Sequence, residues 1–253
     1  MDIKTITTFR DNWSMTFDKN NSTFVSNGKQ AIKEAIRILD SKIIAIPTYT
    51  CQKVLGAVIE SNKNAVIIDC DNKFEMYWDT IPENVDTVIV PHMFGIKHSI
   101  PNKSNRSWKI IEDCSQCMGL SGLGKNADIV VASFGPSKWL PAGTSKLNGG
   151  GLISYDSGDV TWYQDEHIIK RANDLFLKIP EMLERRVELA NELIIAGIDL
   201  IGKDQPNAWL RAMYITDNQQ RKPYIPLHEL YGNYSCKNID SLKGRIDWVS
   251  IIL

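Results

Sequence analysis

Six short apolar runs, separated by polar and turn-forming residues, constrain the fold of this chain more than any other feature. They lie at 43–46, 65–69, 87–91, 109–112, 128–134 and 151–154. Each run has the length and apolar character of a buried strand. Helical stretches are expected between some of them, at 51–61 and near residue 100. Short buried strands that alternate with helices are typical of an α/β fold with a mainly parallel sheet.

The first amphipathic helix is expected to begin at Gly28. From there apolar residues recur at spacings of three and four, at Ala31, Ile32, Ala35, Ile36 and Leu39. Ser26 and Asn27 are both suitable N-caps for this helix. The polar, asparagine-rich residues 1–25 are interpreted as an irregular arm.

The pattern changes after residue 155. Two helical stretches are expected around Pro180, followed by a strand at 208–216 and a loop-rich tail that ends in a short helix near 239–245. We therefore predict two domains. Residues 1–160 form the large domain with its arm, and 161–253 form linking helices and a reduced α+β domain.

Composition excludes several classes of protein. Of 253 residues, 43% are hydrophobic and 23% are charged, as in ordinary globular proteins, and the net charge is −1. There is no basic excess to attract nucleic acid, and no apolar run approaches the ~20 residues that cross a membrane. The first residues lack the pattern of a signal peptide, so we expect a cytoplasmic protein.

The five cysteines are an odd number, which argues against a disulfide framework. Cys114 and Cys117 form a C-x-x-C pair, but the sequence has no second pair to complete a structural zinc site. We interpret the pair as two small side chains and predict no metal.

Residues that could carry chemistry follow several of the predicted strands, where open α/β sheets bind their ligands. The turn 26–31 opens a helix whose N–H groups could bind phosphate. Asp113 ends one strand and could face a protonated ring nitrogen. Lys138 follows another strand, behind Ser133, and could form a Schiff base with a carbonyl. A phosphate-binding turn, a carboxylate for a ring nitrogen and a Schiff-base lysine are together the groups that bind pyridoxal phosphate (PLP).

At these positions the sequence resembles the DegT/DnrJ/EryC1/StrS family, the nucleotide-sugar aminotransferases of PLP fold type I. The resemblance covers most of 24–155 and returns in the tail. The segments that carry it are 28–32, 47–50, 91–95, 111–116, 133–138, 149–151 and 223–228. It implies the PLP fold type I, with a shortened C-terminal domain.

The resemblance also implies roles for individual residues. Lys138 is the catalytic lysine that bonds to the cofactor. The cofactor-binding residues are Asp113 at the pyridine nitrogen, Gln116 beside the ring, and Ser133, Gly28, Lys29 and Gln30 at the phosphate. Cys51 stands where the family commonly has a ring-stacking aromatic, so His92 could stack instead. The substrate-binding residues are Tyr49, Tyr224 and His228.

The implied activity is transfer of an amino group, from glutamate, to a nucleotide-linked keto sugar in surface-polysaccharide or secondary-metabolite biosynthesis. A homodimer is implied as well. A PLP-dependent sugar dehydratase is one alternative, but that branch typically replaces the lysine by histidine, so Lys138 favours transamination. A second alternative is a catalytically impaired subunit that binds a sugar nucleotide or a partner protein. Cys51 and the shortened small domain motivate this alternative. Residues 144–148 form an insertion that brings a second lysine, Lys146.

Overall fold

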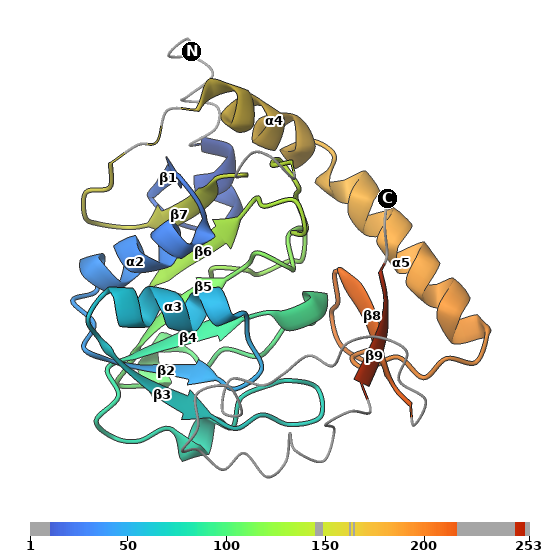
Figure 1. Ribbon diagram of the computed structural model, residues 1–253, viewed down its shortest axis with the longest axis horizontal. Helices are drawn as coiled ribbons and strands as arrows, with labels where there is room; N and C mark the ends of the chain where they lie inside the picture. Colours follow the sequence, from blue (N-terminus) through green and yellow to red (C-terminus); the bar gives the residue numbers. More distant parts are fainter. Residues whose placement is uncertain (1–10, 145–148, 162, 164, 217–245, 251–253) are drawn as a thin grey trace.

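The computed structural model describes residues 11–144, 149–161, 163, 165–216 and 246–250. Within these residues the main element is a seven-stranded sheet with the strand order β1-β7-β6-β5-β4-β2-β3 (Figure 1). Its strands are β1 (Asn21–Val25), β2 (Ile43–Pro47), β3 (Asn64–Ile68), β4 (Thr87–Pro91), β5 (Lys109–Asp113), β6 (Ile129–Ser133) and β7 (Gly151–Tyr155).

The six predicted strands are confirmed to within two residues at either end. The pairs β2–β3, β2–β4, β4–β5 and β5–β6 are parallel, and β7 and β1 add antiparallel pairs at one edge. All five residues of β4 are buried, as expected for a strand covered on both faces. The predicted α/β fold with a mainly parallel sheet is therefore confirmed.

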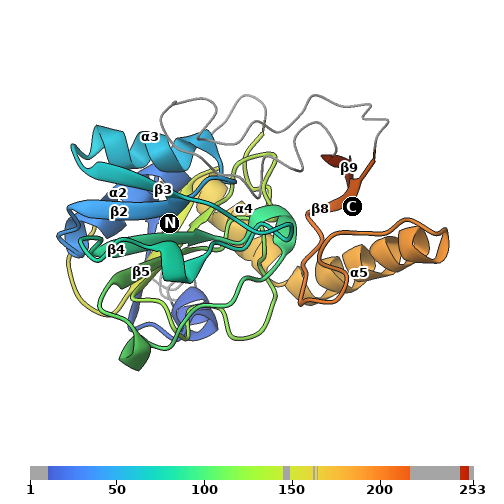
Figure 2. The ribbon, with the colours of Figure 1, turned by 90° about the horizontal axis from the view of Figure 1, so that it is seen from below.

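Two helices, α2 (Gly28–Ile38) and α3 (Gln52–Glu60), cover one face of the sheet (Figure 2). Asn27 is the N-cap of α2, because its Oδ1 accepts a hydrogen bond from the backbone N–H of Gln30 at 3.0 Å. The buried residues of α2 are those predicted from the spacing, Ala31, Ile32, Ala35 and Ile36. They form one hydrophobic core with the apolar side of α3.

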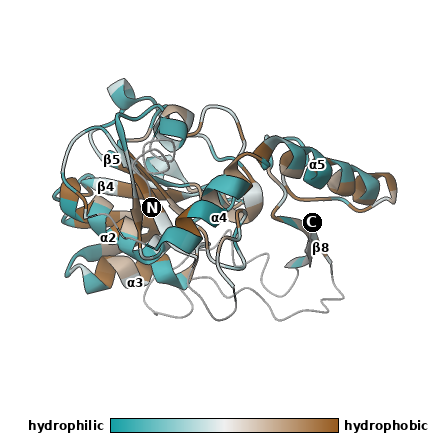
Figure 3. Cartoon of the chain, turned by 90° about the horizontal axis from the view of Figure 1, so that it is seen from above, coloured by the Kyte–Doolittle hydropathy of each residue, from teal (hydrophilic) through white to brown (hydrophobic). Residues whose placement is uncertain are grey.

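A second hydrophobic core lies on the opposite face of the sheet. It joins Trp13, Phe17 and Trp139 to three residues of α4 (Glu166–Phe176), namely Ile168, Ile169 and Ala172. Figure 3 shows the hydrophobic colours concentrated on inner strands such as β4 and β5, and hydrophilic colours on much of α4. Hydrophobic cores therefore pack on both sides of the sheet.

The interpretation of residues 1–25 as an irregular arm is wrong for its described part. Residues 11–16 are helical, and β1 pairs antiparallel with β7. The Ser22 and Ser154 hydroxyls lie 2.6 Å apart, and the hydroxyls of Thr23 and Tyr155 lie 3.0 Å apart. Because these polar groups bond to one another across the strands, β1 can be buried without being apolar.

The prediction of a helix near residue 100 is also wrong, because the chain forms only short 3₁₀ turns in this region. They are η2 (Met93–Gly95) and η3 (Lys103–Asn105); a further turn, η1 (Trp78–Thr80), precedes β4.

Beyond the sheet, α5 (Ile179–Ile195) projects beside a small antiparallel sheet of β8 (Arg211–Ile215) and β9 (Ile246–Ser250) (Figure 1). Pro180 lies in the first turn of α5, where its missing N–H costs no helical bond. The predicted division at 160/161 stays a prediction, although α4 packs into the core of the large sheet. The helix expected at 239–245 lies outside the described residues. Among those that are described, no helix is long and apolar enough to cross a membrane.

Candidate active site

A cavity of about 420 Å³ lies where α2 and α3 begin and where β5 and β6 end. Six predicted site residues line it together: Gly28, Lys29, Cys51, Asp113, Ser133 and Lys138. They come from four separate segments of the chain. The parallel strands direct their carboxyl ends to this edge, which is why residues so distant in sequence meet there.

The start of α2 packs directly on the end of β6. A Cβ atom on Gly28 would lie 2.6 Å from the Cβ of Ser133 and 3.1 Å from its Oγ. Only glycine therefore allows the first turn of α2 to approach the Ser133 hydroxyl this closely. The first N–H groups of a helix have no helical partner and lie at its positive end, so an anion can bind between them and Ser133.

Three consecutive glycines, the last of which begins β7, pack against this turn. A Cβ on Gly151 would lie 2.5 Å from the carbonyl carbon of Asn27, and one on Gly149 would lie 1.6 Å from the carbonyl oxygen of Phe134. Asn27 and Gly150 also form an isolated β-bridge. The turn at the start of α2 is thus positioned by backbone packed against backbone.

Asp113 and Lys138 lie on two turns that are joined to each other. Asp113 ends β5, and its Oδ1 accepts a hydrogen bond from the backbone N–H of Ser115 at 3.0 Å. Lys138 follows β6 in a tight turn in which its N–H donates to the carbonyl of Gly135 at 3.0 Å. The next N–H, that of Trp139, donates to the carbonyl of Ser115 at 3.2 Å. This hydrogen bond joins the turn after Asp113 to the turn that carries Lys138, and both residues line the same cavity.

The two residues that follow Gly28 direct their side chains to other partners. Lys29 lines the cavity, but its ammonium lies 2.7 Å from Oε1 of Glu60 on α3, and this hydrogen bond lowers the pKa of the Glu60 carboxyl. The Gln30 amide donates to Glu34 at 2.9 Å, and Gln30 is not among the residues that line the cavity. The structure therefore brings Gly28 to the site but not the Gln30 side chain.

His92 and Gln116 do not line the cavity either. The Gln116 Oε1 accepts from the backbone N–H of Phe94 at 2.9 Å. His92 is buried, with its Nε2 2.7 Å from Glu112 Oε1. In this arrangement both side chains stabilise the loop after β4, and stacking of His92 on a ligand ring would require another conformation.

Of the three predicted substrate-binding residues, only Tyr49 lies within the described part of the chain. Tyr49 is buried, with its ring centroid 4.7 Å from that of Phe74 and 6.0 Å from that of Phe94. It does not line the cavity. Tyr224 and His228 lie outside the described residues, as does Lys146.

A buried polar cluster lies beneath the site. The Nδ1 of His92 accepts from the backbone N–H of His98 at 3.0 Å, which leaves Nε2 to donate to Glu112. The other Glu112 oxygen accepts from the N–H of Gly124 at 2.7 Å. The buried Glu112 carboxylate is therefore bonded through both oxygens.

The C-x-x-C pair lies next to this cluster. A nitrogen of His92 and the sulfurs of Cys114 and Cys117 lie within 4.8 Å of one another, which is within reach of a metal ion. Burial, however, raises the pKa of the Cys114 thiol well above its ordinary value, and a metal binds the thiolate. The absence of a metal stays a prediction.

Sequence analysis missed several residues that line the cavity. Ser115 lies inside a segment that had already been singled out, and its spacing from Asp113 is the signal that could have found it. Ser137 was not missed: the sequence suggests that it could donate to a phosphate together with Ser133, and it also lines the cavity. Asn27 had been assigned only as an N-cap. Lys53, in the first turn of α3, lies near enough to a predicted strand end to have been suspected.

No family model matches the sequence, and no match was found among curated proteins. Solved structures do match. AtS13 from Actinomadura melliaura has a TM-score of 0.78 at 15% identity, covering 98% of this chain and 86% of its own. A DegT DnrJ EryC1 StrS aminotransferase from Brucella abortus has a TM-score of 0.74 at 16% identity, covering 96% and 83%.

A third similar structure is the PLP form of the putative sugar aminotransferase Spr1654 from Streptococcus pneumoniae. Its TM-score is 0.64 at 14% identity, and the match covers 85% of this chain and 71% of its own. Such low identities show the fold alone. The chain has the fold of the DegT/DnrJ/EryC1/StrS aminotransferases, which is PLP fold type I.

Proposed function

We propose that this protein is a PLP-dependent aminotransferase that transfers an amino group, from glutamate, to a keto sugar carried on a nucleotide. The observation that carries the proposal is the cavity in which Gly28, Asp113, Ser133 and Lys138 meet. An anion-binding turn, a carboxylate and an amine around one cavity are the groups that PLP requires.

The residues present fit the cofactor. The Gly28–Ser133 contact, which a Cβ would prevent, leaves the first N–H groups of α2 and the Ser133 hydroxyl available for the phosphate. The volume of about 420 Å³ is within the range of small-molecule sites. PLP, when bound, supplies an electron sink for the carbon that carries the amino group.

The chain's own residues then have separate tasks. The Asp113 carboxylate would hold a proton at the pyridine nitrogen, since the negative charge favours the protonated ring. Lys138 would provide the amine that holds the cofactor, and the same amine, when free, would act as the base that moves a proton at the substrate carbon. Ser133 and the start of α2 would bind the phosphate and so hold the cofactor in the cavity that Asp113 and Lys138 also line.

The finer features of the proposal rest on the sequence resemblance. They are the nucleotide-linked keto sugar, glutamate as donor, a role in surface-polysaccharide or secondary-metabolite biosynthesis, a homodimer and a cytoplasmic location. The similar fold of a protein described as a putative sugar aminotransferase supports the sugar substrate.

Reductive trapping tests the cofactor assignment. Purified protein is incubated with PLP, its visible absorption is recorded, and the adduct is reduced with borohydride and located by peptide mapping. We expect one label on Lys138, lost in Lys138→Ala. The matched control is Lys53→Ala, which removes another lysine from the same cavity and should still be labelled. Label on Lys146 or on scattered lysines would contradict the proposal.

Cys51 favours a second candidate, a catalytically impaired subunit that still binds the sugar nucleotide. Cys51 lines the cavity at the position where the family has an aromatic ring, so it offers no surface for stacking on the cofactor. A stoichiometric adduct on Lys138 without turnover over a panel of nucleotide-linked keto sugars would favour this candidate. Transamination of any of these keto sugars would rule out the impaired subunit and support the aminotransferase.

A further inference from the structure

A second, larger cavity of about 640 Å³ lies on the opposite face of the sheet. Glu112 contributes to its wall, whereas the adjacent residue, Asp113, lines the candidate active site. Neighbouring residues of a strand face opposite sides of a sheet, so the two cavities are separated by the sheet itself. The second cavity is also bordered by Gln205 and Pro206, which precede β8.

Two buried polar atoms in this wall form no hydrogen bond within the described part of the chain. His98 is only 4% exposed, and its Nε2 forms no hydrogen bond. The Oε1 of Gln205 is also buried and unbonded. Burial lowers the pKa of His98 to about 3, so its ring is neutral at physiological pH and presents either a donor or an acceptor. A buried polar group without a partner costs free energy, and a ligand that bonds to it recovers that cost.

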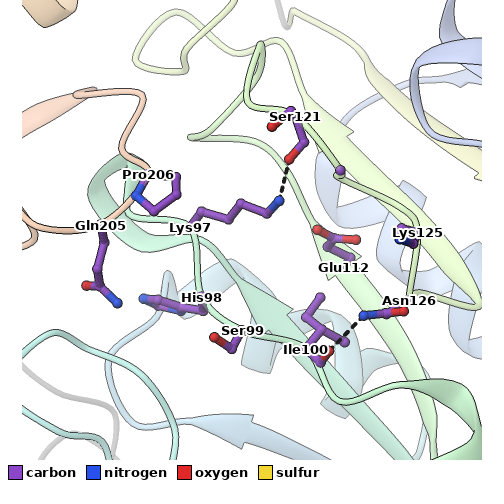
Figure 4. A pocket seen from close by; sticks show the side chains of 11 residues that line it. Lys97, His98, Ser99, Ile100, Glu112, Ser121, Lys125, Asn126, Gln205 and Pro206 are labelled. Atoms are coloured by element: carbon purple, nitrogen blue, oxygen red, sulfur yellow. Dashed lines mark hydrogen bonds between the residues drawn. The ribbon is translucent and has the colours of Figure 1, made fainter.

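The charges around the cavity favour an anion. Lys97 and Lys125 are its cationic residues, and Glu112 is its one acidic residue among those described. Both Glu112 oxygens already accept hydrogen bonds, from His92 and from the N–H of Gly124. Figure 4 shows Lys97 extended toward the carbonyl of Ser121, with His98 and Gln205 at one end of the cavity and Lys125 and Asn126 at the other. The two lysines leave a net positive charge for a ligand to neutralise.

We infer that this cavity binds a small hydroxylated anion, such as a sugar phosphate. A hydroxyl group both donates and accepts, so it can satisfy His98 Nε2 in either tautomer and the Gln205 amide in either orientation. The anionic group is placed at the Lys125 end, where the exposed ammonium is free to turn toward it. This site does not depend on the aminotransferase activity, because it shares no residue with the other cavity.

Calorimetric titration with glucose 1-phosphate tests the inference. We expect saturable binding that is about tenfold weaker for inorganic phosphate, which lacks the hydroxyls, and for glucose, which lacks the charge. Gluconate shares the hydroxyls but carries a carboxylate, so comparing it with glucose 1-phosphate identifies the preferred anionic group. Equal affinity for glucose 1-phosphate and inorganic phosphate would overturn the inference, as would the lack of saturable binding by both hydroxylated anions.

Variants locate the binding. Lys125→Gln changes an exposed residue, so the protein should fold, and we expect it to weaken glucose 1-phosphate binding about threefold to fivefold. Gln205→Ala should weaken glucose 1-phosphate more than inorganic phosphate. Lys138→Gln is the matched control, because it removes a lysine from the other cavity and should leave the affinity unchanged. Loss of binding in Lys138→Gln, with no effect in Lys125→Gln, would overturn the inference.

Discussion

Gly28 and Ser133 approach each other so closely that a Cβ on Gly28 would lie 2.6 Å from the Cβ of Ser133. This contact brings the start of α2 to the end of β6 and forms one wall of the candidate active site. The Ser133 Cβ belongs to a strand end and cannot move far. The distance between the helix and the strand therefore depends on the absence of a single methyl group.

The first prediction follows from that contact. We expect Gly28→Ala to move α2 away from Ser133 and to weaken PLP binding about tenfold, since overpacking costs about 1–3 kcal/mol. The measurement is a titration with PLP followed by absorption. The control is Gly56→Ala in α3, where a Cβ would meet nothing within 4 Å. That change should raise the free energy of unfolding by about 0.5–1 kcal/mol and leave binding unaltered.

The second prediction concerns the carboxylate at the end of β5. Asp113→Asn keeps the size of the side chain and can still accept the hydrogen bond from the Ser115 N–H. It loses the charge that would hold a proton at the pyridine nitrogen. We expect PLP to bind and kcat to fall about 100-fold or more. Asp174→Asn, on the exposed side of α4, is the control. A kcat close to that of the unaltered protein would contradict this role for Asp113.

The third prediction concerns stability. Glu112 is 1% exposed and bonds to both His92 and the N–H of Gly124. Glu112→Ala leaves both donors buried without a partner, so we expect the free energy of unfolding in urea to fall by about 3 kcal/mol. The exposed pair of Lys170 and Asp174 provides the comparison, since Asp174→Ala should change stability little. A small effect of Glu112→Ala would mean that water replaces the carboxylate.

The fourth prediction is a pH dependence. Burial lowers the pKa of His98 to about 3, from a value near 6.5 in the unfolded chain. Between pH 6.5 and about 3 the unfolded chain therefore binds a proton at His98, whereas the folded protein does not. Stability from this group is present above pH 6.5 and is lost as the pH falls toward 3, by about 1.4 kcal/mol per unit. Unfolding measured between pH 7 and 4 should show this slope, reduced in His98→Gln. Identical slopes would indicate that His98 is protonated in the folded protein.

The fifth prediction concerns metal content. Both nitrogens of His92 are engaged, one by Glu112 and one by the His98 N–H, and burial keeps the Cys114 thiol protonated. We expect elemental analysis of the purified protein to find far less than one zinc per chain, even when zinc is present during expression. Stoichiometric zinc that is lost in Cys117→Ala would show that the cluster rearranges around an ion.

The sequence predicted those parts of the fold in which one physical effect dominates. Strands such as β4 are buried along their whole length, so their apolar runs are visible without knowledge of their partners. β1 was missed because its burial depends on hydroxyl pairs with Ser154 and Tyr155, which lie far along the chain. Such pairing leaves no local pattern.

The site was predicted in the same uneven way. Asp113, Ser133 and Lys138 end up at one cavity because parallel strands bring their ends together. The sequence did not predict which way the long side chains point. Lys29 turns to Glu60, and His92 turns to Glu112, because each finds an opposite or hydrogen-bonding group that only the folded chain brings within 2.7 Å.

The adjacent carboxylates of β5 set a limit on how this protein can change. Glu112 is bonded on one face of the sheet and Asp113 opens onto the other. Deleting or inserting one residue in the strand would exchange the two faces. A carboxylate would then be buried without its donors, and the candidate active site would lose its acid. Insertions and deletions can therefore be tolerated in the loops around the sheet during evolution, but not within β5.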